Sequence, residues 1–309
     1  MTQKIISMIY YGVSTNEIMK QLNITKEEFI FYLKKIKEMG YTLIKKEIKG
    51  EKKYFFRYGY DEKIHCINNE YEPEIETEKF RAVVISDNHL GHKRDRIDLI
   101  DNVFEYAAAN SIKYIINTGD FINGVTYSDD IINRGQSNLE QIDYAMIKYP
   151  YDKNIKTILL LGNHDAAPLY EEGIDIRKII ENKRKDIICL GYRFAKILLN
   201  SESIALYHPF YIGDTKQYEN DIKSLYNYTN LPKIAFLGHT HNIYRNNKLD
   251  FPMVMVPSIY DNNSKKPTGA WDFECSLKNS MIDEISLKKL SVDPKVVTKK
   301  TYYNKIKKM

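Results

Sequence analysis

The run Ile155-Lys-Thr-Ile-Leu-Leu-Leu161 leads directly into Gly162-Asn163-His164-Asp165. The run is short and apolar, with β-branched residues at its start, and therefore predicts a buried strand. The polar tetrapeptide then lies where the strand ends and the chain turns, the place at which open α/β sheets present functional groups. Asn offers a carbonyl oxygen to a metal, and His can bind a metal or donate a proton. The alternative is an Asn/Asp turn that happens to contain a His, and the rest of the chain decides between the two.

Four more predicted strands are followed by polar residues in the same way. The strands at 81–86, 114–117, 203–207 and 234–237 precede, in that order, Asp87-Asn88-His89, Gly119-Asp120, His208 and Gly238-His239-Thr240-His241. Five of the seven His residues therefore stand directly after predicted strands. Such a gathering of His with Asp and Asn is typical of a metal site.

The order of the predicted elements indicates the fold class. Strands at 81–86, 114–117 and 155–161 alternate with helical patterns at 95–110 and 139–148. This βαβαβ order favours parallel pairing with the helices outside. Short strands dominate beyond residue 187 and predict a second, more antiparallel sheet. We expect two packed sheets with flanking helices.

The first 60 residues have a different pattern, with three predicted helices and a hairpin. Capping boxes at Ser14-Thr15-Asn16-Glu17 and Thr25-Lys26-Glu27-Glu28 open the second and third helices. Two extended runs follow, at 41–48 and 52–58. This arrangement resembles a winged helix-turn-helix, whose third helix and hairpin are the surfaces laid on DNA. The DNA-binding candidates are Lys26, Lys34, Lys35, Lys37, Lys52, Lys53 and Arg57. Two alternatives stay open, an ordinary small helical domain with solvated lysines and a winged helix used for protein contact.

Charge divides the chain into segments. Residues 1–60 carry 12 Lys and Arg against 6 Asp and Glu, whereas 61–78 carry 7 acids and one Lys. We expect 1–60 to be the small domain, 61–78 an acidic linker, 79–290 the main domain and 291–309 a Lys-rich tail. The net charge of +5 fits a polyanionic partner.

Cysteine usage and hydropathy indicate the compartment. Cys66, Cys189 and Cys275 are far apart and form no Cys-x-x-Cys motif, so neither a disulfide framework nor a thiolate zinc site is indicated. No apolar run approaches the roughly 20 residues of a membrane span, and the start does not read as a signal peptide. We expect a cytoplasmic protein with no membrane partner, and the oligomeric state is left open.

Taken together, the polar motifs resemble the ordered motif set of the calcineurin-like metallophosphoesterases. These are Asp87-x-His89, Gly119-Asp120-x-x-Asn123, Gly162-Asn163-His164-Asp165, His208 and Gly238-His239-x-His241. The resemblance covers roughly residues 80–275. It implies an α/β fold, a four-layer α/β/β/α sandwich with a dinuclear metal site at the sheet ends, here preceded by the small winged helix-turn-helix-like domain.

The resemblance also implies roles. Asp87, His89 and His241 would hold one divalent ion. Asn163, His208 and His239 would hold the other, and Asp120 would bridge both. His164 would not bind metal but would face the scissile phosphate as a catalytic residue. Imidazole and carboxylate ligands without thiolate suit Mn, which we favour, or Fe or Zn. A hydroxide between two such ions is a strong nucleophile at neutral pH.

The substrate is less defined. Asn123, and Arg134 in a polar stretch expected to lie over the site, are candidate substrate-binding residues, since a guanidinium matches phosphate oxygens. Residues 86–92 also resemble the first motif of SbcD-type DNA exonucleases. Those nucleases commonly carry His or Asp where this chain has Asn123, and they add a DNA-capping domain for which few residues follow Leu287.

Three functions are therefore considered. The first is a metal-dependent phosphodiesterase acting on nucleic acid, with nuclease-like chemistry. The second is an enzyme of the same class acting on a cyclic nucleotide or a phosphoprotein, with the N-terminal region as a protein-interaction domain. The third is an inactive DNA-binding regulator, against which the intact set of ligand residues argues.

Overall fold

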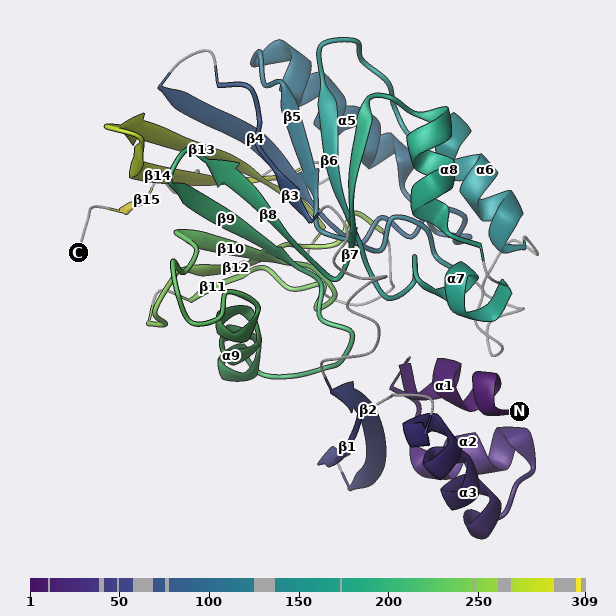
Figure 1. Ribbon diagram of the computed structural model, residues 1–309. Coiled ribbons are helices and arrows are strands. Elements are labelled where there is room, and N and C mark those ends of the chain that lie inside the picture. Colours follow the sequence, from purple (N-terminus) through teal and green to yellow (C-terminus); the bar gives the residue numbers. More distant parts are fainter. Residues whose placement is uncertain are drawn as a thin grey trace.

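The structure is a computed structural model of the 309-residue chain (Figure 1). It describes residues 1–10, 12–38, 42–48, 50–57, 69–75, 78–124, 137–172, 174–246, 248–260, 268–291 and 304–306. Two β-sheets form the body of the molecule, and a separate hairpin lies in the N-terminal region.

The larger sheet has seven strands and carries the βαβαβ unit. Its parallel centre is built from four strands, β4 (Lys79–Ile85), β5 (Tyr114–Asn117), β6 (Lys156–Leu161) and β7 (Ile187–Tyr192). The antiparallel side adds β13 (Ala270–Lys278), β14 (Met281–Leu290) and β15 (Asn304–Ile306). The parallel pairing expected from the sequence is therefore confirmed for the strands at 81–86, 114–117 and 155–161.

The smaller sheet has six strands in the order β11-β12-β10-β9-β8-β3. Their bounds are β3 Glu70–Tyr71, β8 Phe194–Leu199, β9 Glu202–Tyr207, β10 Ile234–Leu237, β11 Tyr244–Asn246 and β12 Met253–Met255. The expectation that the second sheet is the more antiparallel one is wrong, because it is mixed. The β3–β8, β9–β10 and β10–β12 pairs are parallel. Several late strands, β7, β13 and β14, also belong to the larger sheet, because a single sequence does not show which distant strands pair.

Three apolar clusters separate the layers. One lies between the sheets and includes Phe80, Ile158, Leu206, Phe236 and Phe273. A second joins the larger sheet to helices α5 (Ile97–Ala109), α6 (Asn138–Lys148) and α8 (Ile176–Lys183). A third joins the smaller sheet to α9 (Thr215–Leu225). Helices therefore cover the outer face of each sheet (Figure 1), in the helix–sheet–sheet–helix order that the resemblance implied.

The N-terminal region has its own core. It consists of α1 (Thr2–Tyr10), α2 (Thr15–Leu22), α3 (Lys26–Glu38) and the antiparallel pair β1 (Thr42–Ile48) and β2 (Glu51–Arg57). Eight apolar side chains in it are buried, Ile5, Ile6, Met8, Ile9, Ile18, Phe29, Leu33 and Ile36. Reciprocal hydrogen bonds between Thr25 and Glu28 confirm the capping box that opens α3.

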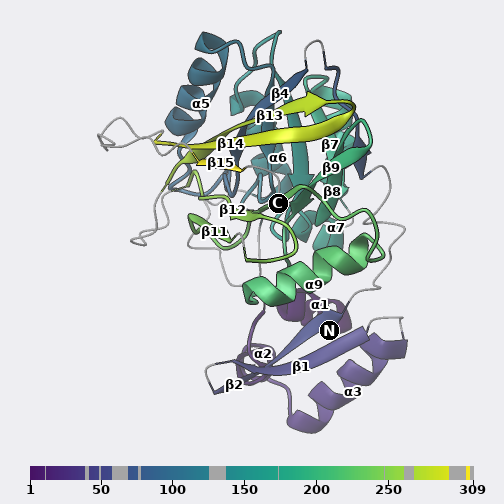
Figure 2. The ribbon, with the colours of Figure 1, turned by 90° about the vertical axis from the view of Figure 1, so that its left-hand side faces the viewer.

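Helix α1 and strand β1 of this region contact the rest of the chain. Helix α1 lies against α7 (Ala167–Glu172), the short helix that follows the Gly162–Asp165 motif. The ammonium group of Lys46 on β1 lies 5.0 Å from the ring centroid of Tyr211. Figures 1 and 2 both show the N-terminal elements at one end of the molecule, below α7 and α9.

The expected segment limits need two adjustments. Part of the predicted acidic linker 61–78 belongs to the smaller sheet, because Glu70 and Tyr71 form β3 and Tyr71 packs on the inter-sheet core. Part of the predicted tail 291–309 belongs to the larger sheet, because β15 pairs with β14. The remainder of both segments lies largely outside the described residues.

Among the described residues no helix combines the length and apolar character needed to span a membrane. Cys189 and Cys275 are buried free thiols, and Cys66 lies outside the described residues.

Candidate metal centre

Five loops meet at one edge of the two sheets, and each begins where a parallel strand ends. The larger sheet supplies the loops after β4, β5 and β6, and the smaller sheet supplies those after β9 and β10. Carboxyl ends of parallel strands lie at the same edge of a sheet, so side chains distant in sequence converge there. The loops are tied by backbone hydrogen bonds, such as those from the N–H of Asp87 to the carbonyl of Gly119 (2.8 Å) and from the N–H of His89 to that of Asp120 (3.0 Å).

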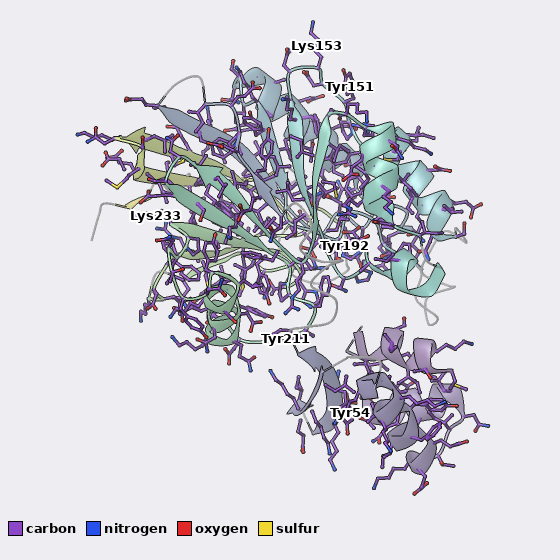
Figure 3. All side chains as sticks on the ribbon, viewed as in Figure 1. Tyr54, Tyr151, Lys153, Tyr192, Tyr211 and Lys233 are labelled. Atoms are coloured by element: carbon purple, nitrogen blue, oxygen red, sulfur yellow. The ribbon has the colours of Figure 1, made fainter. Side chains whose placement is uncertain are left out.

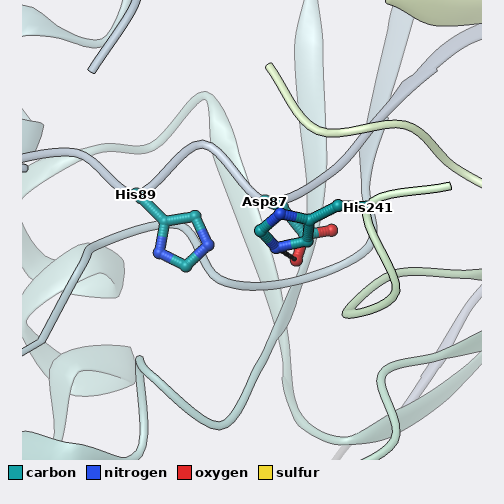
Figure 4. Close-up of side chains that lie close together, drawn as sticks. All are labelled: Asp87, His89 and His241. Carbon is teal, nitrogen blue, oxygen red and sulfur yellow. Dashed lines mark ion pairs between the residues drawn. The ribbon is translucent and has the colours of Figure 1, made fainter. Parts of the chain in front are cut away.

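The first group of candidate ligands is Asp87, His89 and His241 (Figure 4). One ligand atom from each lies within 4.8 Å of the others, a spacing at which they can share one ion. The Nε2 atom of His241 is 3.0 Å from Oδ1 of Asp87. Burial acts to raise the pKa of Asp87, but His241 and His208 outweigh it and hold the pKa at about 2. Asp87 is therefore a carboxylate at neutral pH.

The second group is Asn163, His208 and His239. The side-chain oxygen of Asn163 lies 3.1 Å from Nε2 of His208 and 2.9 Å from Nδ1 of His239. His208 donates from Nδ1 to the carbonyl of Thr118 at 2.8 Å, which orients its ring and leaves Nε2 toward the site. Burial, with His208 next in effect, lowers the pKa of His239 to about 3, so its imidazole is neutral as a metal ligand must be.

Asp120 lies between the two groups. Its Oδ2 atom is 3.2 Å from Nε2 of His208 and 3.8 Å from Nε2 of His89. Asp120 also forms a ligand cluster with His208 and His239. Burial acts to raise its pKa, but the surrounding imidazoles, His208 foremost, lower it well below the ordinary value. One carboxylate thus faces both candidate ion positions.

His89 provides a direct test of whether a cation fits. Its side chain is buried, yet neither ring nitrogen has a hydrogen-bond partner among the described residues. A buried polar group without a partner carries a free-energy cost of about 1–3 kcal/mol. Burial, followed by the nearby His164, lowers the pKa of His89 well below its usual value, so the ring is neutral. A neutral buried imidazole facing two carboxylates is a ligand set for a divalent ion.

His164 has a different environment from the other histidines. Its Nδ1 atom donates to the backbone carbonyl of Asn123 at 2.5 Å, and its backbone N–H donates to Oδ1 of Asp120 at 2.9 Å. Its ring packs edge-on against His89, with centroids 4.7 Å apart. His164 also belongs to a ligand cluster with His89 and Asp120, so geometry places it at the site but does not by itself exclude it as a ligand.

Five candidate ligands share an uncommon backbone conformation. The φ angles are 51° at Asp87, 47° at His89, 52° at Asp120, 69° at His239 and 51° at His241. Residues other than Gly seldom adopt this left-handed region, although Asp and His are enriched in it. Strained backbone of this kind gathers at functional sites, where the surrounding structure holds it.

Glycines precede several ligands because the loops approach one another too closely for a side chain. A Cβ atom added at Gly119 would lie 2.2 Å from Nδ1 of His208, and one at Gly162 would lie 2.2 Å from Oδ1 of Asp120. A Cβ at Gly238 would lie 2.6 Å from the same His208 nitrogen. The Gly-Asp, Gly-Asn and Gly-His pairs of the sequence are therefore points where one loop packs on the ligand of another.

Asp165 completes the motif without facing the ions. Its carboxylate accepts three backbone N–H groups, from Phe121 (3.0 Å), Ile122 (2.8 Å) and Gly162 (2.8 Å). Burial and the charge of Asp120 raise the pKa of Asp165 to about 7, while these three donors oppose the rise. Asp165 joins the loop after β6 to the loop after β5.

The candidate substrate-binding residues lie as follows. Asn123 is buried beside His164, which it contacts through its backbone carbonyl. Arg134 lies outside the described residues. Sequence reasoning missed Tyr260, whose ring lies 4.7 Å from that of His89 and 5.9 Å from that of His241. Tyr260 stands five residues after the end of β12, and a lone Tyr gave no signal of its own.

The candidate DNA-binding residues occupy the N-terminal region. Lys26, Lys34, Lys35 and Lys37 are exposed on α3, and Lys52 is exposed on β2. Lys53 is half-buried and lies 3.7 Å from Glu51, and the side chain of Arg57 is not described. The exposed lysines thus lie on α3 and on the hairpin, and Lys53 is partly buried.

The sequence matches a model of a known protein family. The model for calcineurin-like phosphoesterases matches residues 80–256, which is more than half of the chain. The chain belongs to the calcineurin-like phosphoesterase family. With the His and Asp clusters intact, this family member is a metal-dependent phosphoesterase that uses divalent ions.

The solved structures to which this phosphoesterase is similar are distant from it in sequence. An archaeal phosphodiesterase is 15% identical, with 68% of this chain and 100% of that chain covered and a TM-score of 0.41. Vacuolar protein sorting 29 from Cryptosporidium parvum is 14% identical, with 74% and 99% covered and a TM-score of 0.45. The phosphoesterase YfcE from E. coli is 13% identical, with 67% and 98% covered and a TM-score of 0.39. No curated protein matches this sequence.

Proposed function

We propose that this phosphoesterase hydrolyses phosphodiester bonds in nucleic acid with two divalent ions. Asp87, His89 and His241 would hold one ion, and Asn163, His208 and His239 the other, with Asp120 shared. The convergence of both groups on Asp120 carries the proposal, because Oδ2 of this carboxylate lies 3.2 Å and 3.8 Å from a histidine nitrogen of each group. When bound, two ions would supply a nucleophile at neutral pH and stabilise charge on the phosphoryl oxygens.

The chain's own residues would orient the substrate and move a proton. His164 donates from Nδ1 to the carbonyl of Asn123, and Nε2 is the ring nitrogen that would contact a phosphoryl oxygen or leaving group. A side chain in that position contributes roughly 10²–10⁴-fold to a hydrolysis rate. Asn163 and Asp165 hold the loop that carries His164, through contacts to His208 and to the loop after β5.

Nucleic acid is the proposed substrate because lysines gather at three places on the chain. They lie on α3, on the hairpin and in the segment from Lys288 to the last residue, which contains 8 Lys and one Asp. The net charge of +5 has the same sign. The weaker resemblance of residues 86–92 to the first motif of DNA exonucleases also supports this proposal. We favour Mn as the native ion on the basis of the imidazole and carboxylate donors.

One observation favours the second function, a cyclic-nucleotide or phosphoprotein substrate with a protein-binding N-terminal region. Ile30 and Phe31 on α3 are 55% and 52% exposed. Apolar side chains at the centre of an exposed helix face suit a protein partner better than a phosphate backbone.

A substrate panel tests the proposal. Protein loaded with Mn would be incubated with single-stranded DNA, duplex DNA, RNA, cyclic nucleotides and a phosphopeptide, with Asp120→Asn protein as the matched control. We expect hydrolysis of a nucleic acid by the wild type and loss of metal and rate together in the variant. Hydrolysis of a cyclic nucleotide or phosphopeptide alone would transfer the assignment to the second function. A wild type that binds no metal and hydrolyses nothing with Mn, Zn, Fe or Co would refute both.

A further inference from the structure

A basic cleft lies at the opposite edge of the larger sheet from the metal centre. It has a volume of about 640 Å³ and is formed by the end of α6, the segment leading into β6 and the segment between α8 and β7. Lys156 begins β6, whereas the metal-centre loop begins after Leu161 at its other end. Figure 3 shows Tyr151 and Lys153 at the top of the view, away from Tyr211 at the N-terminal side.

Positive charge dominates the cleft. Its lining includes Lys148, Lys153, Lys156 and Lys185, and all four side chains belong to exposed residues. The lining acid, Asp186, is held by the guanidinium of Arg184 at 2.9 Å and 2.6 Å. Like charges brought together around a hollow repel one another, and this repulsion is relieved when an anion binds among them.

Arg184 joins the two walls of the cleft. It donates to the backbone carbonyls of Met146, Tyr149 and Pro150 at 2.8–3.0 Å, and so fastens the segment after α6 to the segment before β7. Its side chain is only 11% exposed. Arg184 is therefore a structural residue of the wall, and the exposed lysines Lys148, Lys153 and Lys156 are the cations that a ligand would meet.

Two apolar side chains stand exposed at the same cleft. Tyr151 is 68% exposed and Ile147 is 77% exposed, and both line it. An exposed aromatic ring among lysines is the arrangement that proteins use to stack a base while ammonium groups contact its backbone phosphates. A ring that stacks needs an unpaired base, which single strands offer and duplexes do not.

We propose that this cleft is a second, non-catalytic site that binds single-stranded nucleic acid. Lys148, Lys153 and Lys156 contact successive phosphates, and Tyr151 stacks on a base. The volume falls within the range of roughly 300–1,000 Å³ found for ligand sites. Six residues of β6 separate the cleft from the metal centre, a span of about 20 Å. A strand held here is therefore anchored outside the centre and not in it.

The test measures binding without hydrolysis. Full-length protein would be titrated against a fluorescent phosphorothioate thymidine oligomer of about 12 nucleotides, which resists cleavage, and anisotropy would be followed over a series of salt concentrations. We expect Tyr151→Ala to weaken binding by roughly 5- to 100-fold. Joint replacement of Lys148, Lys153 and Lys156 by Gln should lower the log–log salt slope by about 2, since each phosphate contact contributes about 0.7.

The matched control replaces Lys216, Lys248 and Lys278 by Gln, which removes the same charge from exposed lysines that do not line the cleft, and it should keep the affinity and slope of the wild type. The cleft variants should hydrolyse a small diester at the wild-type rate, because their residues lie at the other end of β6. Unchanged affinity and slope in both cleft variants would overturn the proposal, as would a loss of duplex affinity in the Tyr151→Ala protein as large as its loss of single-strand affinity. Since binding is measured without cleavage, a failure here is distinguishable from a wild type that has no phosphodiesterase activity.

Discussion

Glycine at position 162 shows at the scale of one residue why the motif has its spacing. Its φ angle is not in the left-handed region, so Ala would be tolerated by the backbone, yet the new Cβ would lie 2.2 Å from Oδ1 of Asp120. We expect Gly162→Ala to displace Asp120, to lower metal occupancy and to destabilise the fold by about 1–3 kcal/mol. Metal content measured by elemental analysis, with thermal unfolding alongside, checks this. Gly50→Ala is the control for metal content: its φ of 78° makes Ala costly to stability there, but nothing lies within 4 Å of its Cβ, so the metal content should stay unchanged. Full occupancy in Gly162→Ala would mean that the loop yields without disturbing the ligand.

His164 gives the second prediction at this scale. Replacing it by Gln retains a hydrogen-bonding side chain but removes the imidazole, so the rate should fall by roughly 10²–10⁴-fold while both ions remain bound. Kinetics on a small aryl diester and elemental analysis on the same sample separate the two effects. Loss of an ion together with the rate would make His164 a ligand, which its cluster with His89 and Asp120 also permits.

At the residue scale, most of the candidate site could be predicted from the sequence. The candidate ligands follow strands that are recognisable by their apolar runs, and the structure brings all seven together. The backbone conformation of the ligands could not be predicted from the sequence, because the positive φ of Asp87 or His241 depends on contacts between loops from different strands. Tyr260 was missed for the same reason, since only the fold brings its ring to His89.

At the scale of elements, one charged network fastens three of them. Asp272 on β13 accepts two hydrogen bonds from Arg81 on β4, at 2.9 Å and 2.7 Å, and one from Tyr106 on α5 at 2.7 Å. Burial acts to raise the pKa of Asp272, but Arg81 and Tyr106 outweigh it and lower the pKa below the ordinary 3.8. The native state therefore favours the carboxylate more than the unfolded chain does.

This sign gives a pH-dependent prediction. The stabilisation by Asp272 is complete above the unfolded pKa of 3.8 and is lost as the pH falls through the lower folded pKa. Asp272→Asn should reduce the free energy of unfolding by about 1–3 kcal/mol at neutral pH. The difference between wild type and variant should shrink below about pH 4. Urea denaturation at several pH values measures it. A difference that stays constant across that range would show that Asp272 acts by shape and not by charge.

Helices and strands could be predicted where the signal is local, but the pairing of distant strands could not. Helices α2 and α3 began at their capping residues as expected, because a cap is a local signal. Strand β3 was missed because two residues in an acidic segment have no periodicity, and its pairing with β8 lies far along the chain. Three late strands, β7, β13 and β14, were found individually but assigned to the wrong sheet, since pairing of distant segments is a tertiary effect.

At the scale of the whole molecule, the N-terminal region lies against the catalytic one. Helix α1 contacts α7, which begins three residues after His164, and Lys46 lies over Tyr211, three residues after His208. A chain that begins at residue 69 keeps every candidate ligand and all three apolar clusters of the sheets, so it should fold. It should nevertheless show a lower kcat on a small diester, because α7 loses a neighbour.

The matched variant for this truncation is Lys46→Ala in the full chain. It removes one cation–π contact, worth about 0.5–1 kcal/mol at an exposed site, but leaves α1 in place. We expect its kcat to stay near that of the wild type, with a small fall in the unfolding temperature. Wild-type kcat in the truncated chain would show that the N-terminal region is attached beside the centre without supporting it.

The left-handed backbone of the five ligands has a consequence for the stability of the metal-free chain. Each of those residues costs on the order of 1–2 kcal/mol relative to glycine, which occupies that conformation freely. Glycine at any one of the five positions, Asp87, His89, Asp120, His239 and His241, would relieve that cost and remove a candidate ligand in the same step. At these positions the chain therefore has ligand side chains at the expense of backbone stability.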